Sequence, residues 1–263
     1  MTPASTLALV LPCFNPLPGW APNILGSLHR LQALLPPATV IHLYLVNDGS
    51  TRNIDPTEVA LIRQALPHFT YVSYPENRGK GYALRAGVQQ VKEAMCLFTD
   101  IDFPYEEQSM ADLYAMLHDG QCDLAVGIRD SNYYQHVPMV RRRVSHLLRG
   151  LTRNLLHLPV SDTQCGLKGF NAAGRALFLQ TTINRYLFDL ELLFLTSYHS
   201  QVRVEPVLVS LKPGVIFSKL NPRILFTEGK SFLKILRRRI KQKEPFREAD
   251  LSYTLPKVPT VKV

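Results

Sequence analysis

Cysteine is scarce in this chain. The 263 residues include four, Cys13, Cys96, Cys122 and Cys165, and no two of them have the CxxC spacing of a redox or zinc motif. Three of the four adjoin apolar segments, which is typical of buried free thiols. The pattern therefore favours a reduced compartment over a disulfide framework, and it identifies no zinc site.

Long hydrophobic runs are also missing. No segment approaches the roughly 18 uninterrupted apolar residues that a membrane-spanning helix needs. The first apolar run lacks a basic flank and stops at Pro12, so it is interpreted as a first strand and not as a cleaved signal. We therefore expect a soluble or peripheral protein.

The remaining composition is that of an ordinary globular chain. Hydrophobic residues make up 46% and charged residues 19%, which is enough for one catalytic-size α/β core. The net charge of +9 indicates anionic partners, and nucleic acid, anionic lipid and phosphorylated substrates all satisfy it.

Short β-rich segments alternate with amphipathic helical ones through the first half of the chain. This rhythm predicts an α/β fold, a nucleotide-binding sandwich with a mostly parallel central sheet. Beyond residue 127 this alternation becomes less regular. We expect the second half of the chain to contain the part of the site that binds a second substrate, the acceptor. The expected strands are 7–11, 40–46, 69–74, 95–99, 124–127, 166–171 and 202–211, and the expected helices are 24–35, 55–66, 82–94, 109–117, 140–156 and 189–199.

The segment 97–102, LFTDID, is an apolar strand that ends in two aspartates one residue apart. Ligands of parallel α/β sheets bind beyond the carboxyl ends of the strands, and alternate residues leave the same face. Asp100 and Asp102 are thus placed to hold Mg²⁺ or Mn²⁺. The competing interpretation is that Asp102 is a helix N-cap, a common role for aspartate.

Three more strand-end loops carry polar residues. Pro12 and Asn15 lie in a turn that could present backbone groups to a base or ribose. Asp48 precedes small hydroxylated residues, and its carboxylate either accepts from a nucleoside or forms an Asx-turn. Lys80 lies among glycines at a helix entrance suited to phosphate, although the segment matches neither the dinucleotide fingerprint nor the Walker spacing. A plain helix start explains Lys80 equally well.

Two later segments, 162–170 (DTQCGLKGF) and 188–193 (FDLELL), carry a more specific signal. Together with the earlier loops they resemble family 2 glycosyltransferases of GT-A fold. The resemblance covers residues 7–211 and is greatest to the polyprenyl-phosphate (dolichyl-phosphate) glucosyl- and mannosyltransferase branch. Members of that branch carry D-[ST]-x-x-G-[FL]-[KR] followed by F-D-x-E-L.

The resemblance implies a role for each strand-end residue. The donor diphosphate would be held through a metal, Mg²⁺ or Mn²⁺. One departure is Pro104, where the mannosyltransferases often have a glutamine, so a third protein ligand is in doubt. The implied assignments are Pro12, Asn15 and Asp48 in the nucleotide pocket, Lys80 beside it, and Asp100 and Asp102 on the metal, with Asp102 counted as catalytic.

The acceptor side is assigned by the same resemblance. Relatives use an arginine-and-serine helix with a basic residue after it, here Arg141, Arg142, Ser145 and Lys168, to hold an acceptor phosphate. A solvated helix face with basic side chains is the alternative for each arginine. Asp162 would orient these cations or, for a hydroxyl acceptor, act as the base, and a plain turn residue is the alternative. Asp189 and Glu191 would cap a helix or pair with the basic cluster.

Positive charge is concentrated near the carboxyl end. Residues 223–243 include eight basic residues and one acid, so this segment carries +7 of the net +9. Leu225, Phe232, Leu236 and Ile240 recur at helical spacing, which favours a helix lying on an anionic membrane. A helix docked on the core with a solvated basic face is the alternative. We expect a GT-A domain over 1–222, this helix over 223–243 and a flexible tail over 244–263.

The favoured function is an inverting glycosyltransferase that moves a hexose from UDP-glucose or GDP-mannose to a polyprenyl phosphate, on the cytoplasmic face of a membrane. One alternative is a relative acting on a saccharide or lipid hydroxyl. Another is a nucleic-acid-binding module, although no aromatic-interleaved basic series supports nucleic acid as a partner. The segment 162–170 favours UDP-glucose slightly, while donor base, acceptor identity and oligomeric state stay open.

Overall fold

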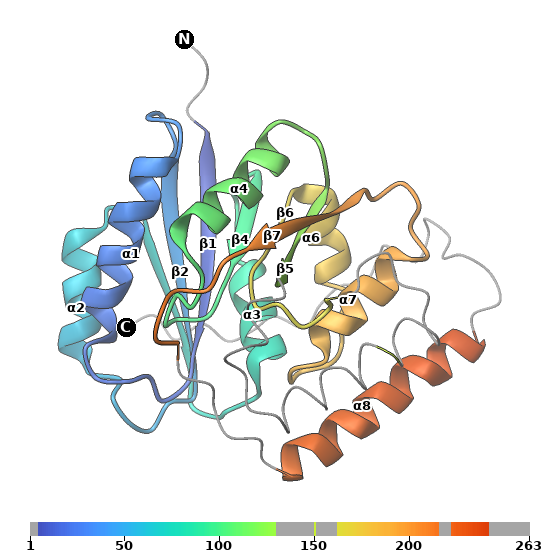
Figure 1. Cartoon of the computed structure of the whole chain (residues 1–263). Helices are drawn as coiled ribbons and strands as arrows, with labels where there is room; N and C mark the ends of the chain where they lie inside the picture. Colours follow the sequence, from blue (N-terminus) through green and yellow to red (C-terminus); the bar gives the residue numbers. More distant parts are fainter. Residues whose placement is uncertain (1–4, 130–149, 151–161, 216–221, 242–263) are drawn as a thin grey trace.

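The computed structural model describes residues 5–129, 150, 162–215 and 222–241. Its centre is a seven-stranded sheet in the order β3-β2-β1-β4-β6-β5-β7 (Figure 1). β6 runs antiparallel to both of its neighbours, and the other pairs are parallel. The strands are β1 (Thr6–Cys13), β2 (Val40–Asp48), β3 (Phe69–Tyr74), β4 (Met95–Phe98), β5 (Leu124–Arg129), β6 (Lys168–Phe170) and β7 (Val204–Val209).

Helices cover both faces of the sheet. Side chains of α1, α2 and α4 share one core cluster, and those of α3, α6, α7 and α8 share the other. The helices are α1 (Trp20–Leu34), α2 (Pro56–Ala65), α3 (Lys80–Val88), α4 (Glu107–His118), α6 (Ala172–Phe178), α7 (Phe188–Thr196) and α8 (Pro222–Lys241).

The two cores follow from the alternation of apolar residues along β1. Leu7, Leu9 and Leu11 enter the cluster beneath α1 and α4, whereas Ala8 and Val10 enter the cluster beneath α3. Both sets are fully buried, because a central parallel strand is covered on each face. Each strand end is therefore held between two packed layers.

The alternating strands and helices of the first half confirm the sequence-based prediction. The second half differs in two ways. The prediction missed α6, whose N-cap is Asn171, where the side-chain oxygen accepts from the backbone N–H groups of Ala173 and Gly174. The antiparallel direction of β6 was also not predicted. The expected helix over 140–156 lies outside the described residues, Gly150 apart.

The α8 helix packs against protein. Ile235 is buried in the core cluster of α7, and Phe232 and Leu236 pack on the same cluster. The sequence-based interpretation turned Phe232 and Leu236 toward a membrane, and the structure shows the docked alternative because α7 offers an apolar surface. The described outer face of α8 includes Lys230, Leu233, Lys234 and Arg237, which are exposed. Among the described residues, no helix combines the length and apolar composition needed to cross a bilayer.

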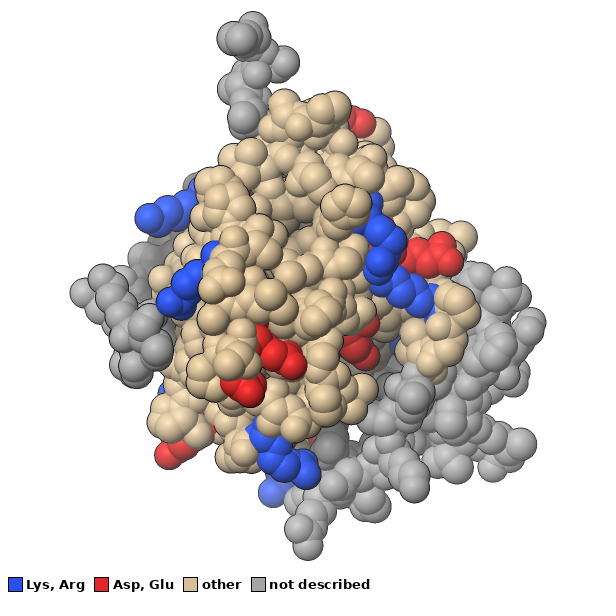
Figure 2. Space-filling model, turned by 90° about the vertical axis from the view of Figure 1, so that its left-hand side faces the viewer, with Lys and Arg blue, Asp and Glu red and all other residues tan. Residues whose placement is uncertain are grey.

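The opposite side of the molecule is less strongly basic. On the face that includes α1 and α2, lysines, arginines and acids are scattered among uncharged residues, with no large patch of one sign (Figure 2). The positive charge that the sequence concentrates in 223–243 is thus a local property of the α8 region.

Candidate active site

The candidate site lies at the carboxyl edge of the sheet, where the strand order reverses. β1 pairs with β2 on one side and with β4 on the other, so their following loops leave the same edge. Ligands of open α/β sheets bind at such a switch point. The loops after β1, β2 and β4 contain Asn15, Gly49 and Asp100, respectively.

Asp100 and Asp102 reach solvent at this edge. The Asp100 side chain is 40% exposed, and its Oδ1 lies 2.5 Å from the Lys80 ammonium at the first residue of α3. Asp102 is exposed as well. Burial acts to lower the pKa of Lys80, but the charges of Asp100 and Asp189 outweigh it and raise that pKa. Lys80 therefore remains a cation beside the carboxylate pair.

The turn after the pair is held in an uncommon conformation. Phe103 is buried and has a φ of 47°, and its N–H donates to the Asp100 carbonyl over 3.0 Å. A left-handed phenylalanine costs energy that surrounding contacts must offset. Two backbone hydrogen bonds do this, from Glu106 N–H to Ser210 O and from Lys212 N–H to Pro104 O, each 2.9 Å long.

The pair has the donor chemistry of a site for a hard divalent cation. Carboxylate oxygens are the ligands that Mg²⁺ and Mn²⁺ prefer. Partial burial and the charge of Asp100 raise the pKa of Asp102, while Lys80 and Lys212 oppose the increase. Within the described parts of the chain, no third His, Cys, Asp or Glu completes a cluster. Two protein carboxylates thus fit the role of cation ligands.

The Asp48 carboxylate accepts hydrogen bonds from other residues of the protein. Its Oδ1 accepts from the Tyr74 hydroxyl and the Arg78 N–H, both at 2.8 Å, and its Oδ2 accepts from the Asn77 amide and the Gly79 N–H, both at 2.9 Å. These contacts hold the loop before Lys80 in place. The proposed contact between Asp48 and a nucleoside stays a prediction.

Asn15 joins the loops after β1 and β2. Its backbone is left-handed, with a φ of 47°. Its side-chain oxygen accepts from the N–H groups of Thr51 and Arg52, at 2.9 and 3.0 Å, and its own N–H donates to the Ser50 hydroxyl. Pro12 lies within β1 and is partly buried. Both residues line the edge on which the nucleotide pocket was predicted.

Lys168 makes its polar contacts within the protein. It is fully buried in β6, and its ammonium donates to the carbonyls of Thr163 and Cys165 and to Asp189 Oδ1, the last over 2.7 Å. These three partners use the three N–H donors of a lysine. Lys168 thereby ties the 162–167 loop to α7, and the acceptor-phosphate contact expected of it stays a prediction.

Asp162 is engaged by a cation that the sequence analysis overlooked. Arg129, the last residue of β5, donates to Asp162 from its backbone N–H and from two guanidinium nitrogens, at 2.7 to 3.0 Å. Both side chains are largely buried. Arg129 is not among the cations that Asp162 was expected to orient, so the predicted roles of Asp162 as an orienting residue or a base both stay predictions. Arg141, Arg142 and Ser145 lie outside the described residues.

Most of the chain matches one protein family, and this match decides the family to which the chain belongs. Residues 8–176 match the model described as "Glycosyl transferase family 2". The chain belongs to this family. The matched range contains every strand-end residue of the candidate site, from Pro12 to Lys168, and stops before α7 and α8.

Curated relatives of this family 2 member carry a single kind of name. The chain is 28% identical over 210 residues to a dolichyl-phosphate beta-glucosyltransferase of Drosophila melanogaster, an alignment covering 74% of this chain and 63% of that protein. It is 27% identical over 214 residues to the Homo sapiens protein of the same name, covering 75% and 64%. The chain thus spans a little under two thirds of the length of these relatives.

Solved structures of low identity share the GT-A fold. One is glucosyl-3-phosphoglycerate synthase from Mycobacterium tuberculosis with Mn²⁺ and UDP, which has a TM-score of 0.59 and 18% identity and covers 89% of this chain and 80% of that one. Another is a mannosyltransferase from Pyrobaculum calidifontis with GDP-Man and Mn²⁺, which has a TM-score of 0.55 and 15% identity and covers 91% and 65%. These likenesses support the predicted fold.

Three side chains of this family 2 site were not singled out from the sequence. Arg129 ends a strand, so its position could have suggested it. Tyr105 is buried, and its hydroxyl accepts the N–H of Gly166, whose backbone passes beside Asp100. Lys212 lies 110 residues beyond Asp102 in the chain, and no local pattern connects the two.

Proposed function

We propose that this chain transfers a hexose from a nucleotide sugar to a polyprenyl phosphate, with UDP-glucose as the favoured donor. The observation that supports it best is the solvent-accessible Asp100 and Asp102 pair beside Lys80, at the carboxyl edge of the sheet. The names of the curated relatives support the lipid-phosphate acceptor and the glucosyl donor.

The proposed donor chemistry depends on charge. Asp100 and Asp102 would hold the divalent cation, which when bound stabilises negative charge on the departing nucleoside diphosphate. Lys80 places a second positive charge at the same edge, next to Asp100. The backbone around Lys80 is held by Asp48, so this cation is positioned before the donor arrives.

The proposed acceptor chemistry needs no strong base. A phosphate oxygen is already anionic at neutral pH, so attack on the anomeric carbon with inversion requires alignment of two anions and no proton removal. The engagement of Asp162 by Arg129 suits that role better than proton abstraction. A hydroxyl acceptor would instead need one oxygen of Asp162 to be released from Arg129.

The membrane part of the proposal rests on α8. With its apolar side packed on the core cluster that includes α7, the helix presents Lys230 and Arg237 outward. Each basic residue near an anionic surface contributes about 1 kcal/mol of attraction. We propose peripheral binding by charge, on the cytoplasmic face, and expect it to weaken as salt is raised.

The test is a transfer assay with a matrix of donors and acceptors. Purified protein is incubated with Mn²⁺ or Mg²⁺, labelled UDP-glucose or GDP-mannose, and either a polyprenyl phosphate, the matching polyprenol or a saccharide. Labelled lipid from UDP-glucose and the phosphate is the expected product. Product with the polyprenol or saccharide and none with the phosphate would favour the hydroxyl-acceptor alternative. Tight nucleic-acid binding with no nucleotide-sugar binding would contradict both enzyme functions.

A further inference from the structure

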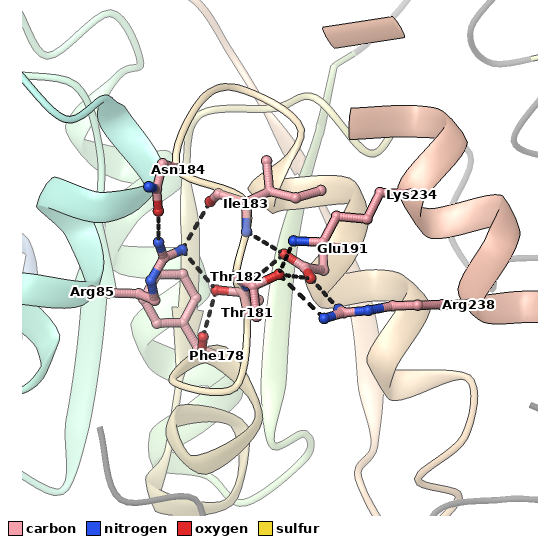
Figure 3. Close-up of polar contacts among 9 residues, drawn as sticks. All are labelled: Arg85, Phe178, Thr181, Thr182, Ile183, Asn184, Glu191, Lys234 and Arg238. Atoms are coloured by element: carbon pink, nitrogen blue, oxygen red, sulfur yellow. Dashed lines mark hydrogen bonds and ion pairs between the residues drawn. The ribbon is translucent and has the colours of Figure 1, made fainter. Parts of the chain in front are cut away.

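The loop between α6 and α7, residues 179–187, lies between two helices that are far apart in the sequence. Figure 3 shows Arg85 of α3 reaching it from one side and Lys234 and Arg238 of α8 from the other. We call this segment the α6–α7 loop. Its polar contacts connect the carboxyl-terminal basic helix to the helix that begins with Lys80.

On the α3 side, the loop is held by a buried arginine. Arg85 is 7% exposed, and it donates to the Thr181 hydroxyl at 3.2 Å, the Ile183 carbonyl at 2.9 Å and the Asn184 side-chain oxygen. Burial lowers the pKa of Arg85, and the negative charge of Glu191 opposes that effect. Arg85 therefore holds three residues of the loop against α3.

On the α7 side, the loop is held by a fully buried glutamate. Glu191 Oε2 accepts the N–H groups of Thr182 and Ile183, both at 2.7 Å, and Oε1 accepts the Thr182 hydroxyl at 2.9 Å. Glu191 Oε1 also accepts from the Arg238 guanidinium. The buried negative charge thus has one ion-pair partner among its described contacts, and that partner is supplied by α8.

The loop then contacts the first turn of α3 directly. The Tyr82 N–H donates to the Asn184 carbonyl over 3.2 Å. A Cβ at Gly79 would lie 2.5 Å from the Asn184 oxygen, and one at Gly81 would lie 2.5 Å from the Ile183 oxygen, so only glycine allows this approach. Lys80 lies between these two glycines. A displaced loop would therefore move the backbone that carries Lys80.

We propose that Arg238 is a positioning residue for the donor site. By pairing with Glu191 it holds the α6–α7 loop against α3, and this contact orients Lys80 toward Asp100. The inference rests on the proposed function for the role of Lys80. It gives the basic helix a second role besides surface charge, because Arg238 turns inward while Arg237, its neighbour, is exposed.

The positioning role proposed for Arg238 differs from the attachment of α8 to the protein, because apolar contacts supply most of that attachment. Ile235 is buried, and Phe232 and Leu236 pack on the same core cluster, so α8 retains its main attachment when Arg238 is truncated. Glu228 provides a further contact by accepting the Leu187 N–H over 2.8 Å. Substitution of Arg238, whose side chain is 35% exposed, should thus leave a folded protein in which the α6–α7 loop has lost one support.

The experiment compares Arg238→Ala and Arg238→Lys with Arg63→Ala, the loss of one positive charge from an exposed position on α2. Hydrogen exchange of the full chain is measured without ligand, and UDP-glucose binding with Mn²⁺ and steady-state transfer are measured at a temperature where every variant is folded. We expect Arg238→Ala to increase exchange at residues 181–187 and 80–84. We also expect the dissociation constant or KM of UDP-glucose to rise about fivefold or more.

The controls set the other outcomes. Arg238→Lys should recover part of the loss, because it restores a charge but not the guanidinium fork, and Arg63→Ala should match the parent chain. A lower melting temperature for Arg238→Ala with unchanged exchange at 80–84 and unchanged UDP-glucose affinity would overturn the proposal. If the parent chain binds no nucleotide sugar, the proposed function fails, while the exchange experiment still tests the coupling to α3.

Discussion

Two sets of acidic residues near the same edge of the sheet have different surroundings. Asp100 and Asp102 reach solvent, and one lysine contacts Asp100. Asp48, Asp162 and Asp189 are buried and accept hydrogen bonds from tyrosine, arginine, lysine or backbone donors. The first set has oxygens available for a ligand, and the second set holds loops in place.

The comparison shows that residue type does not decide the role. A buried carboxylate is tolerated when donors offset its lost hydration, and those donors then occupy its lone pairs. An exposed carboxylate needs no such partners and keeps its capacity to bind a cation. Substituting members of each set should thus affect different properties, catalysis in one case and stability in the other.

Asp102→Asn should have the largest effect. Removing one of the two carboxylates proposed to bind the metal should lower transfer by about a thousandfold, equivalent to about 4 kcal/mol, with little change in melting temperature. Transfer assays and thermal unfolding measure the two properties, and Asp112→Asn on the exposed surface of α4 is the control. Full activity of Asp102→Asn, or activity that survives chelation of divalent metal, would contradict the metal assignment.

Lys168→Met should act on stability. It leaves the buried Asp189 carboxylate without its ion-pair partner, which costs about 3 to 4 kcal/mol in the free energy of unfolding. The double variant Lys168→Met and Asp189→Leu should recover part of this loss, because no unpaired charge then remains. Urea unfolding of the parent chain, the single variant and the double variant measures these differences in the free energy of unfolding. A stable Lys168→Met that fails only in acceptor binding would restore the sequence-based role of Lys168.

Asp48→Asn should have a smaller effect. An asparagine of the same shape accepts from some of the four donors but presents an N–H₂ group to others, so we expect a loss of about 2 kcal/mol. We expect a lower free energy of unfolding and faster hydrogen exchange of the Gly79 N–H, both measured without ligand. Unchanged stability combined with a higher KM for the donor would show that Asp48 acts mainly on the nucleotide.

The smallest effect concerns acid stability. Burial acts to raise the pKa of Glu107, but hydrogen bonds from Lys212 and Arg30 outweigh it and lower the pKa to about 2. Because the folded pKa lies below the ordinary glutamate value of 4.5, this stabilisation is present above pH 4.5 and lost as pH falls toward 2. Glu107→Gln should lower stability at pH 7 by about 1 to 2 kcal/mol and equal the parent near pH 2. Exposed Glu106→Gln is the control.

Local pattern was enough to predict much of the candidate site. Alternation of apolar residues predicted β1, and the aspartates after β4 were singled out from their spacing and from their place in a series of strand-end loops. The partners could not be predicted in this way. Lys168 and Asp189 are 21 residues apart, and Asp162 and Arg129 are 33 apart, so only the folded chain brings each pair together.

The same limit explains α8. Its amphipathic pattern predicted a helix with one apolar side, but such a pattern does not say whether that side meets lipid or protein. The answer depended on the apolar surface of α7, where Phe188 through Thr196 are all buried. The docking of α8 also depended on Glu191, for which the sequence suggested a helix cap or a partner of the basic cluster.

The amino-acid sequence by itself determined the family, the α/β rhythm of the first half and the position of the carboxylate pair, because periodicity and strand-end motifs are local properties of a chain. Tertiary structure alone decided which acids stay open to a ligand, that Lys168 is buried, and that Arg238 faces inward. Those outcomes depend on donors and apolar surfaces brought from distant segments, and desolvation acts only once the chain has packed.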